Sequence, residues 1–214
     1  MNEAIAVIIG YLLGSTPSAY LFTRLATSKD IRRMGGGNVG GLNVFREVGF
    51  WPAAAVGIVD LGKGAAAVAV AYWLLEVTTP FVLLAGLAAV IGHNWMVWLK
   101  FSGGKGMGAA FGALAVLFPV YGYPQGLAIL LVIMLIPFIF TRNVALSLGI
   151  GLAALPFIVW FITGSGFATI IAIVLGLLIA LRFLPTALAA IRKSGMAGAF
   201  GVDHWQRDKS KKES

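Results

Sequence analysis

Apolar stretches of membrane-spanning length recur from one end of this chain to the other, and they constrain its fold more than any other feature. Hydrophobic residues make up 59% of the 214 residues and charged residues only 11%, which is far outside the composition of soluble globular domains. A helix crosses a bilayer core with roughly 20 apolar residues. We therefore predict an all-α fold, a polytopic integral membrane helical bundle of about seven transmembrane helices, at residues 4–23, 51–75, 81–99, 107–121, 123–140, 144–163 and 167–184.

Basic residues are segregated along the chain in a way that predicts its orientation. Of the 16 Lys and Arg residues, all except Lys63 fall after the first, third and fifth predicted spans or at the C-terminal end. By the positive-inside rule, a multi-pass protein of the cell (inner or plasma) membrane then has its N-terminus outside and its C-terminus in the cytoplasm. Reading residues 107–140 as one broken helix gives six spans and breaks this segregation, so we favour seven.

The basic charge also bears on domain organisation and partners. We predict a helical membrane domain at residues 1–190 and a basic cytoplasmic tail at residues 191–214. The net charge of +8 indicates contact with anionic membrane lipids, because basic residues beside membrane spans meet lipid head groups. We predict no nucleic-acid partner, and the sequence leaves the oligomeric state open.

The polar segment at residues 30–46 interrupts the apolar runs and carries five glycines. Glycine lets the backbone adopt positive φ and approach a ligand closely, and successive N–H groups in such a loop can bind an anion. Arginine and asparagine side chains in the same segment add donors suited to phosphate oxygens. We therefore predict a phosphate site built from Arg32, Gly36, Gly37, Asn38, Asn43 and Arg46. The alternative is a flexible basic loop that only sets the topology.

Asp60 and Lys63 lie within the second predicted span, in an otherwise apolar stretch. Residues at i and i+3 share a helix face and can neutralise one another. Charges inside a span are costly and mark a bundle interior or a ligand site, and the adjacent Gly64 allows close approach. We predict that Asp60, Lys63 and Gly64 contact substrate; a structural ion pair between helices is the alternative.

A second glycine-rich loop follows the third predicted span. His93 begins this segment, and Gly103, Gly104 and Lys105 lie in the loop itself. Backbone N–H groups with a lysine ammonium again suit phosphate, although the spacing is not that of a Walker A loop. The histidine is suited to act as a hydrogen-bond donor or a general base.

The polar elements together predict a class of chemistry. They fall on the predicted cytoplasmic side, where a water-soluble phosphate compound can reach them, among helices rich in small residues that can accept an acyl chain. We infer a membrane enzyme that handles a phosphorylated, partly lipidic substrate. His93 and His204 are far apart in a chain without cysteine, so we predict neither a metal site nor a cofactor. No Gly-x-Ser-x-Gly motif supports serine catalysis.

Five short motifs occur in an order and spacing that resembles a known family. They are Gly14-Ser15-Thr16-Pro17, Asp30-Ile31-Arg32, the Asn38…Asn43…Arg46 loop, Asp60-x-x-Lys63-Gly64, and Gly92-His93 followed by Gly103-Gly104-Lys105-Gly106. Over the first half of the chain they resemble the bacterial membrane-bound acyl-phosphate:glycerol-3-phosphate acyltransferases. The second half matches in hydropathy alone.

The resemblance implies an activity and a role for each matching residue. The 1-hydroxyl of glycerol 3-phosphate would attack the carbonyl of an acyl phosphate, giving lysophosphatidic acid and phosphate, the first step of phospholipid synthesis. Arg46, Asn38 and Asn43 would hold phosphate, and Lys63 would serve the acyl phosphate. His93 and Lys105 would orient the acceptor and stabilise developing charge, so the implied catalytic set is His93, Arg46 and Lys105.

The sequence also departs from the family pattern. Gly36 stands where the family has a functional serine, and Leu42 where it has threonine. Near the end, the family's His-Arg-x-Asn pattern is replaced around Arg182. We favour a working acyltransferase, with two alternatives: a divergent paralogue that acylates another acceptor, and a non-catalytic membrane protein that binds anionic lipid.

Overall fold

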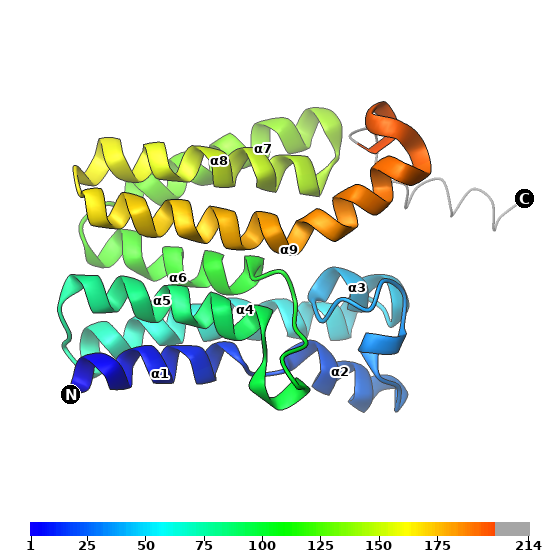
Figure 1. Ribbon diagram of the computed structural model, residues 1–214, viewed down its shortest axis with the longest axis horizontal. Coiled ribbons are helices and arrows are strands. Elements are labelled where there is room, and N and C mark those ends of the chain that lie inside the picture. The colour runs from blue at the N-terminus through cyan, green and yellow to red at the C-terminus, as the bar shows by residue number, and fades with distance from the viewer. Residues whose placement is uncertain (200–214) are drawn as a thin grey trace, which may run out of the picture. The chain divides into compact units, whose positions relative to one another are not determined.

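Helices make up the fold, as predicted. The structure is a computed structural model that describes residues 1–199, and within that range the β-structure is limited to one isolated bridge between Met96 and Ser102. The α-helices are α1 (Asn2–Gly14), α2 (Ser18–Thr27), α3 (Gly41–Glu47), α4 (Phe50–Ala69), α5 (Thr79–Asn94), α6 (Met107–Val120), α7 (Pro124–Thr141), α8 (Val144–Thr163) and α9 (Gly166–Ala199) (Figure 1). Two short 3₁₀ turns, η1 (Ile31–Arg33) and η3 (Val97–Leu99), and one π-helical turn, η2 (Val70–Leu74), complete the described elements. The chain divides into two compact units, Met1–Tyr123 and Pro124–Ser214.

Several of the helices have the length and composition of membrane spans. Among the described residues, five helical segments qualify, at residues 2–27, 50–74, 124–141, 146–163 and 166–189. Helices α5 and α6 are apolar but shorter, with 16 and 14 residues. A turn at Gly122, where φ is +82°, separates α6 from α7. Residues 107–140 therefore form two helices, while the total of seven crossings stays a prediction.

Two predicted spans differ from the structure in detail, each beside polar residues. The first, at residues 4–23, lies within the candidate span at residues 2–27, but that span contains a break between α1 and α2 at Pro17, whose backbone lacks an N–H group and cannot continue the hydrogen-bond ladder. The third span ends at Asn94 and not at residue 99. The apolar residues that follow enter η3 and a turn in which Lys100 and Phe101 have positive φ.

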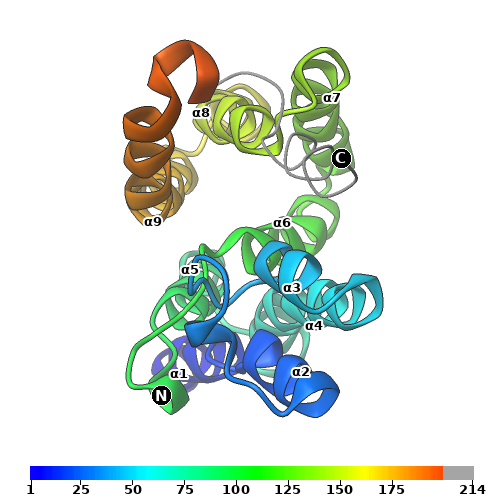
Figure 2. The same ribbon diagram turned by 90° about the vertical axis from the view of Figure 1, so that its right-hand side faces the viewer.

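Glycines bring the helices of the first unit into close contact. Gly14 of α1 packs against the backbone of Ala89 in α5, and Gly64 of α4 packs against the backbone of Ala109 in α6. A Cβ at either glycine would overlap that backbone. In both views α1, α4, α5 and α6 run beside one another (Figures 1 and 2). Small residues at helix crossings are typical of membrane bundles, where close backbone packing replaces the hydrophobic driving force.

An apolar cluster fixes the polar loops at one end of the first unit. It is made by buried residues of α2, η1, α3, α4 and η3 and of the loops beside them: Ala19, Ile31, Val39, Val44, Val56, Met96 and Leu99. Side chains from both glycine-rich regions take part, so the two loops share one packed base. Such close-packed apolar contact limits loop motion.

The second unit is a simpler arrangement of apolar helices. Helix α8 contacts α7 and α9, and Asn143 caps the start of α8 by accepting a hydrogen bond from the Leu146 N–H at 3.0 Å. This is the usual way to satisfy a helix N-terminus. Helix α9 continues to Ala199, past the predicted start of the basic tail. Residues 200–214, the rest of that predicted tail, lie outside the described residues.

Candidate functional site

The break between α1 and α2 turns backbone and side-chain groups toward α4. Ser18, the first residue of α2, is buried and donates a hydrogen bond from its hydroxyl to Asp60 Oδ1 at 2.6 Å. The carbonyl oxygen of Thr16, which lies in the break itself, accepts a hydrogen bond from Lys63 Nζ at 3.2 Å. An uninterrupted helix would have kept that carbonyl in its own ladder. The break therefore supplies partners for two charges in the middle of a membrane span.

Asp60 is the centre of a buried polar cluster that joins three helices. Besides Ser18, its Oδ1 atom pairs with Lys63 Nζ at 2.9 Å and lies 3.6 Å from His93 Nδ1. The side chains of Asp60, Lys63 and His93 are all less than a tenth exposed. We name Ser18, Asp60, Lys63 and His93 the buried cluster. It confirms the predicted pairing of Asp60 with Lys63, and it adds a histidine from α5.

His93 also lies against both glycine-rich loops. A Cβ on Gly104 would overlap the His93 Nε2 atom and would come within 2.6 Å of the Val39 carbonyl oxygen. The Gly104 N–H donates to the His93 carbonyl at 3.0 Å, which folds the second loop back over the end of α5. Gly103 packs against the carbonyls of His93 and Asn94. The imidazole Nε2 therefore lies where the two loops meet.

Asn43 organises the first glycine-rich loop from within. Its side-chain nitrogen donates to the carbonyls of Met34 and Asn38, both at 3.1 Å, and its Oδ1 accepts from the Gly36 N–H at 3.4 Å. Gly37 has φ of +68°, a backbone that side chains rarely adopt. The buried Asn43 amide thus holds a turn in shape, and we assign it a structural role beside any contact with phosphate.

Gly36 differs from its neighbours in having open space around it. No atom lies within 4 Å of the position that a Cβ would take there, and its φ is not in the positive region. A serine side chain therefore fits this position without strain. The structure gives no steric reason for the glycine that stands in place of the family serine.

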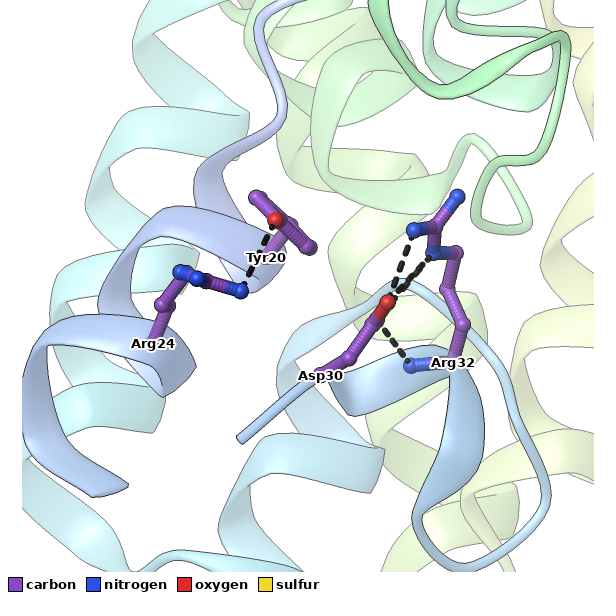
Figure 3. A network of polar contacts seen from close by, with 4 residues as sticks. All are labelled: Tyr20, Arg24, Asp30 and Arg32. Carbon is purple, nitrogen blue, oxygen red and sulfur yellow. Dashed lines mark hydrogen bonds and ion pairs between the residues drawn. The ribbon is translucent and has the colours of Figure 1, made fainter. Parts of the chain in front are cut away.

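Arg32 has an acidic partner within its own loop. Its guanidinium forms an ion pair with Asp30 at 2.7 Å and lies over the Tyr20 ring, 5.4 Å from its centroid (Figure 3). Arg24 donates to the Tyr20 hydroxyl at 3.4 Å in the same view. The hydrogen bonds from Arg32 hold the pKa of Asp30 below its ordinary value, and the carboxylate raises the pKa of Arg32. The predicted phosphate ligand Arg32 thus already pairs with a carboxylate; we name these four residues the surface cluster.

The other predicted residues lie along the loops around His93. Lys105 is half-buried and directly follows Gly104, Asn38 is half-buried in the first loop, and Arg46 is exposed in the last turn of α3. Gly64 is at the crossing of α4 and α6, where it serves helix packing. The structure therefore brings His93, Asp60, Lys63 and Gly104 together, and it leaves the cationic side chains along the two loops.

Sequence reasoning missed Ser18 and Val39. Ser18 follows Thr16-Pro17 within an apolar run, and a cap residue followed by proline is a signal for a helix start, so the break was open to prediction. Val39 contributes through its backbone carbonyl, and no sequence signal reports such a contact.

Among the described residues, no group of His, Cys, Asp and Glu side chains is suited to hold a metal. The backbone N–H groups and cationic side chains of the site can bind anions, and its imidazole can exchange a proton.

Comparisons with known proteins show which family this chain resembles. A family profile described as glycerol-3-phosphate acyltransferase matches residues 4–192. The chain is 54% identical over 202 residues to glycerol-3-phosphate acyltransferase 1 of Dehalococcoides mccartyi, covering 94% of this chain and 97% of that protein. It is 39% identical over 182 residues to a glycerol-3-phosphate acyltransferase of Parasynechococcus marenigrum, covering 85% and 83%.

A solved membrane protein has a similar fold. It is PlsY (YgiH), an integral membrane glycerol 3-phosphate acyltransferase whose crystal structure in its glycerol 3-phosphate form is 26% identical to this chain. The TM-score is 0.80, and the match covers 91% of this chain and 94% of that one. The lysophosphatidic acid form matches with a TM-score of 0.75. This likeness confirms an all-α integral membrane fold.

Proposed function

This chain belongs to the glycerol-3-phosphate acyltransferase family, and we propose that His93 and the two glycine-rich loops form its active site, with an acyl phosphate as the donor. The protein is a membrane acyltransferase of phospholipid biosynthesis, as predicted. Membership at 54% identity over nearly the whole chain favours this function over a non-catalytic lipid-binding protein. The donor, the residues and their roles are the parts that we propose.

One observation carries the assignment of the site. The Nε2 atom of His93 lies against Gly104 and near the Val39 carbonyl, at the meeting point of the loops that were predicted separately to bind phosphate. The reaction brings two phosphate-bearing substrates together, and each loop offers backbone N–H groups and cationic side chains for one of them. Such a transfer depends on holding the two substrates side by side, and an imidazole at this point is suited to exchange a proton with them.

The proposed reaction proceeds without a protein-bound intermediate. The 1-hydroxyl oxygen of glycerol 3-phosphate attacks the carbonyl carbon of the acyl phosphate, and a new ester C–O bond forms while the hydroxyl proton passes to His93 Nε2. The bond from the carbonyl carbon to the phosphate oxygen then breaks, and its electron pair leaves with the phosphate. The departing phosphate takes the proton from His93, so lysophosphatidic acid and hydrogen phosphate are released and the imidazole is neutral again.

The remaining residues bind and orient the substrates in this proposal. Lys105 and the N–H groups around Gly103 and Gly104 stabilise charge that develops on the transferring group. Arg46 and Asn38, with the backbone of Gly36 and Gly37, bind the phosphate of the other substrate. Lys63 contacts Asp60 and the Thr16 carbonyl, and we therefore assign Lys63 to the buried cluster and not to a phosphate.

We place the site on the cytoplasmic side of the cell membrane. The basic residues of both glycine-rich loops follow the first and third predicted spans, and the positive-inside rule assigns such loops to the cytoplasm. Glycerol 3-phosphate is soluble in water and would reach the loops from there. The acyl chain of the donor would stay in the surrounding lipid.

Acyl transfer by the purified protein tests the proposal. Palmitoyl phosphate or palmitoyl coenzyme A is supplied as donor, with labelled glycerol 3-phosphate as acceptor. We expect labelled lysophosphatidic acid from palmitoyl phosphate alone, and at least about tenfold less from Lys105→Ala, because the ammonium no longer stabilises developing charge. Product from the coenzyme A ester would contradict the proposed donor. Full activity of Lys105→Ala would contradict the proposed site.

A further inference from the structure

Basic side chains gather at the end of α2, outside the site proposed above. Arg24 is in the last turn of α2, Lys29 lies just after that helix, and Arg33 ends η1; all three are exposed. We name these three residues the cationic patch. None of them forms an ion pair with a carboxylate in the part of the chain that the structure describes, whereas Asp30 offsets the charge of the neighbouring Arg32. Three positive charges are therefore presented to the surroundings at one end of the first unit.

The backbone that carries the cationic patch is well packed. Ser28 has φ of +59° and ends α2, so the chain turns and η1 lies against α2. Ile31 of η1 is fully buried in the apolar cluster that also contains Ala19 of α2. Asp30 accepts a hydrogen bond from the Arg32 N–H at 3.0 Å and so caps η1. A fixed backbone on both sides of the patch lowers the entropy cost of holding its charges around one anion.

Tyr20 orients Arg24 without neutralising it. The Tyr20 hydroxyl accepts a hydrogen bond from Arg24 at 3.4 Å, and the guanidinium of Arg32 lies over the Tyr20 ring (Figure 3). A guanidinium has five N–H donors, so this contact leaves donors on Arg24 for another acceptor. Planar guanidinium groups match the oxygens of a phosphate. The surface cluster therefore directs a charged phosphate-binding group toward the patch.

The length of the first candidate span places Arg24 at the level of lipid head groups. That span, at residues 2–27, has 26 residues, which at 1.5 Å each extend about 39 Å, against about 30 Å for the hydrocarbon core. Its last turn therefore passes beyond the hydrocarbon. Exposed aromatic side chains are typical of this level, and Phe50 and Trp51 begin α4 directly after α3, which lies at the same end of the unit as α2 (Figure 1).

Apolar side chains beside Arg24 indicate a lipid and not a soluble phosphate. Leu21 and Leu25 are 46% and 81% exposed on α2, and residues three or four positions apart share a helix face. An acyl chain can lie along these leucines while its head group meets Arg24. A free phosphate ion would gain nothing from them.

We propose that the cationic patch, together with Leu21 and Leu25, binds an anionic phospholipid of the surrounding membrane. The head-group phosphate contacts Arg24, and Lys29 and Arg33 attract it by their charge. Basic residues at a membrane surface each favour anionic lipid, and salt screens this attraction. The patch contains none of the residues to which we assign the reaction, so this proposal does not depend on the proposed function.

Quenching of a single fluorescent label by brominated lipids tests the proposal. The chain has no cysteine, so Ala26→Cys carries one label beside the patch. Ile8→Cys, exposed on α1, carries it in the same span away from the patch. Each protein is reconstituted in phosphatidylcholine vesicles that contain brominated phosphatidylglycerol or, at the same mole fraction, brominated phosphatidylcholine. We expect brominated phosphatidylglycerol to be enriched about fivefold at Ala26 but not at Ile8, and the enrichment to fall in high salt.

Two pairs of arginines provide matched variants. Arg24→Gln with Arg33→Gln removes two charges from the patch, whereas Arg142→Gln with Arg192→Gln removes two exposed charges elsewhere in the chain. The first pair should reduce the enrichment at Ala26 to within about twofold of random mixing, because two of the three attracting charges are lost. The second pair should leave the enrichment unchanged.

Several outcomes would overturn the proposal. Equal quenching by the two brominated lipids at Ala26, before any arginine is changed, is one, and an enrichment that survives Arg24→Gln with Arg33→Gln is another. An enrichment that high salt leaves unchanged would also overturn it, and that measurement needs no arginine variant. If inorganic phosphate abolished the enrichment at constant ionic strength, the patch would bind free phosphate and the proposal would fail.

Discussion

The buried cluster and the surface cluster lie in the same unit and contain ion pairs of nearly equal length, yet their surroundings differ. The pair of Asp60 with Lys63 is 2.9 Å long, with side chains 7% and 3% exposed, whereas the pair of Asp30 with Arg32 is 2.7 Å long, with side chains 17% and 34% exposed. Water can replace a lost partner in the second pair but not in the first. Burial, and not ion-pair length, therefore decides how much a single substitution costs.

Removing Lys63 should have the largest effect. Lys63→Met leaves Asp60 buried beside Ser18 and His93 without its nearest cation, and we expect a loss of about 3 kcal/mol in the free energy of unfolding. Thermal unfolding in detergent, followed by tryptophan fluorescence, measures this loss. The double variant Asp60→Leu with Lys63→Met should recover most of that stability, because no unpaired charge is left. A Lys63→Met protein as stable as the wild type would contradict the claim that burial decides the cost of losing one partner of an ion pair.

Closing the space beside His93 should come next. Gly104→Ala places a Cβ on the Nε2 atom and against the Val39 carbonyl, so either the imidazole or the loop must shift. We expect kcat to fall at least tenfold, about 1.4 kcal/mol in the barrier, with a smaller change in thermal stability. Activity within twofold of the wild type would show that the two loops do not meet at His93.

Breaking the surface cluster should cost little and should depend on pH. Asp30→Asn removes the partly exposed pair with Arg32, for which we expect less than about 1 kcal/mol. The pKa of Asp30 is lowered from 3.8 in the folded protein, so its stabilisation is present above pH 3.8 and disappears as the pH falls through the lower folded value. The difference in the free energy of unfolding between the wild type and Asp30→Asn, measured at pH 7 and in acid, gives this stabilisation. A stability difference between the two proteins that grows in acid would contradict a stabilising role for the ionised Asp30.

Gly36→Ser should have the smallest effect on stability. The position has open space and no positive φ, so we expect a change within about 0.5 kcal/mol, the usual range for surface substitutions. Activity is the sharper readout, because the hydroxyl adds one donor to the first loop. A marked loss of stability would show that the loop is packed more tightly than the structure describes.

Hydropathy allowed most of the fold to be predicted. A helix that crosses a membrane must satisfy its own backbone, so long apolar runs and helices coincide, and α6 and α7 were separated correctly at the turn near Gly122. The break at Pro17 was missed because the apolar pattern continues on both sides of it. The end of α5 was placed too late because Trp95 to Leu99 are apolar although the chain turns there.

The candidate site was predictable in its parts but not in its assembly. Asp60 and Lys63 pair within one helix, so their spacing indicated the contact. The approach of His93 to Asp60 joins α5 to α4, and only the packing of the bundle brings them together. The predicted phosphate ligand Arg32 also pairs with Asp30, a contact that the close spacing of the two opposite charges indicated. Ser18 contributes through a contact 42 positions away in sequence, for which a single sequence carries no signal.

The central claim is that His93, held in the buried cluster, accepts the proton at the meeting point of the two loops. His93→Gln tests it most directly, because glutamine keeps a polar side chain in the cluster but cannot act as a base. With saturating palmitoyl phosphate and glycerol 3-phosphate, we predict a kcat at least about a hundredfold lower than that of the wild type, in protein that unfolds within a few degrees of it. A folded variant that retains the wild-type kcat would show that proton transfer takes place elsewhere.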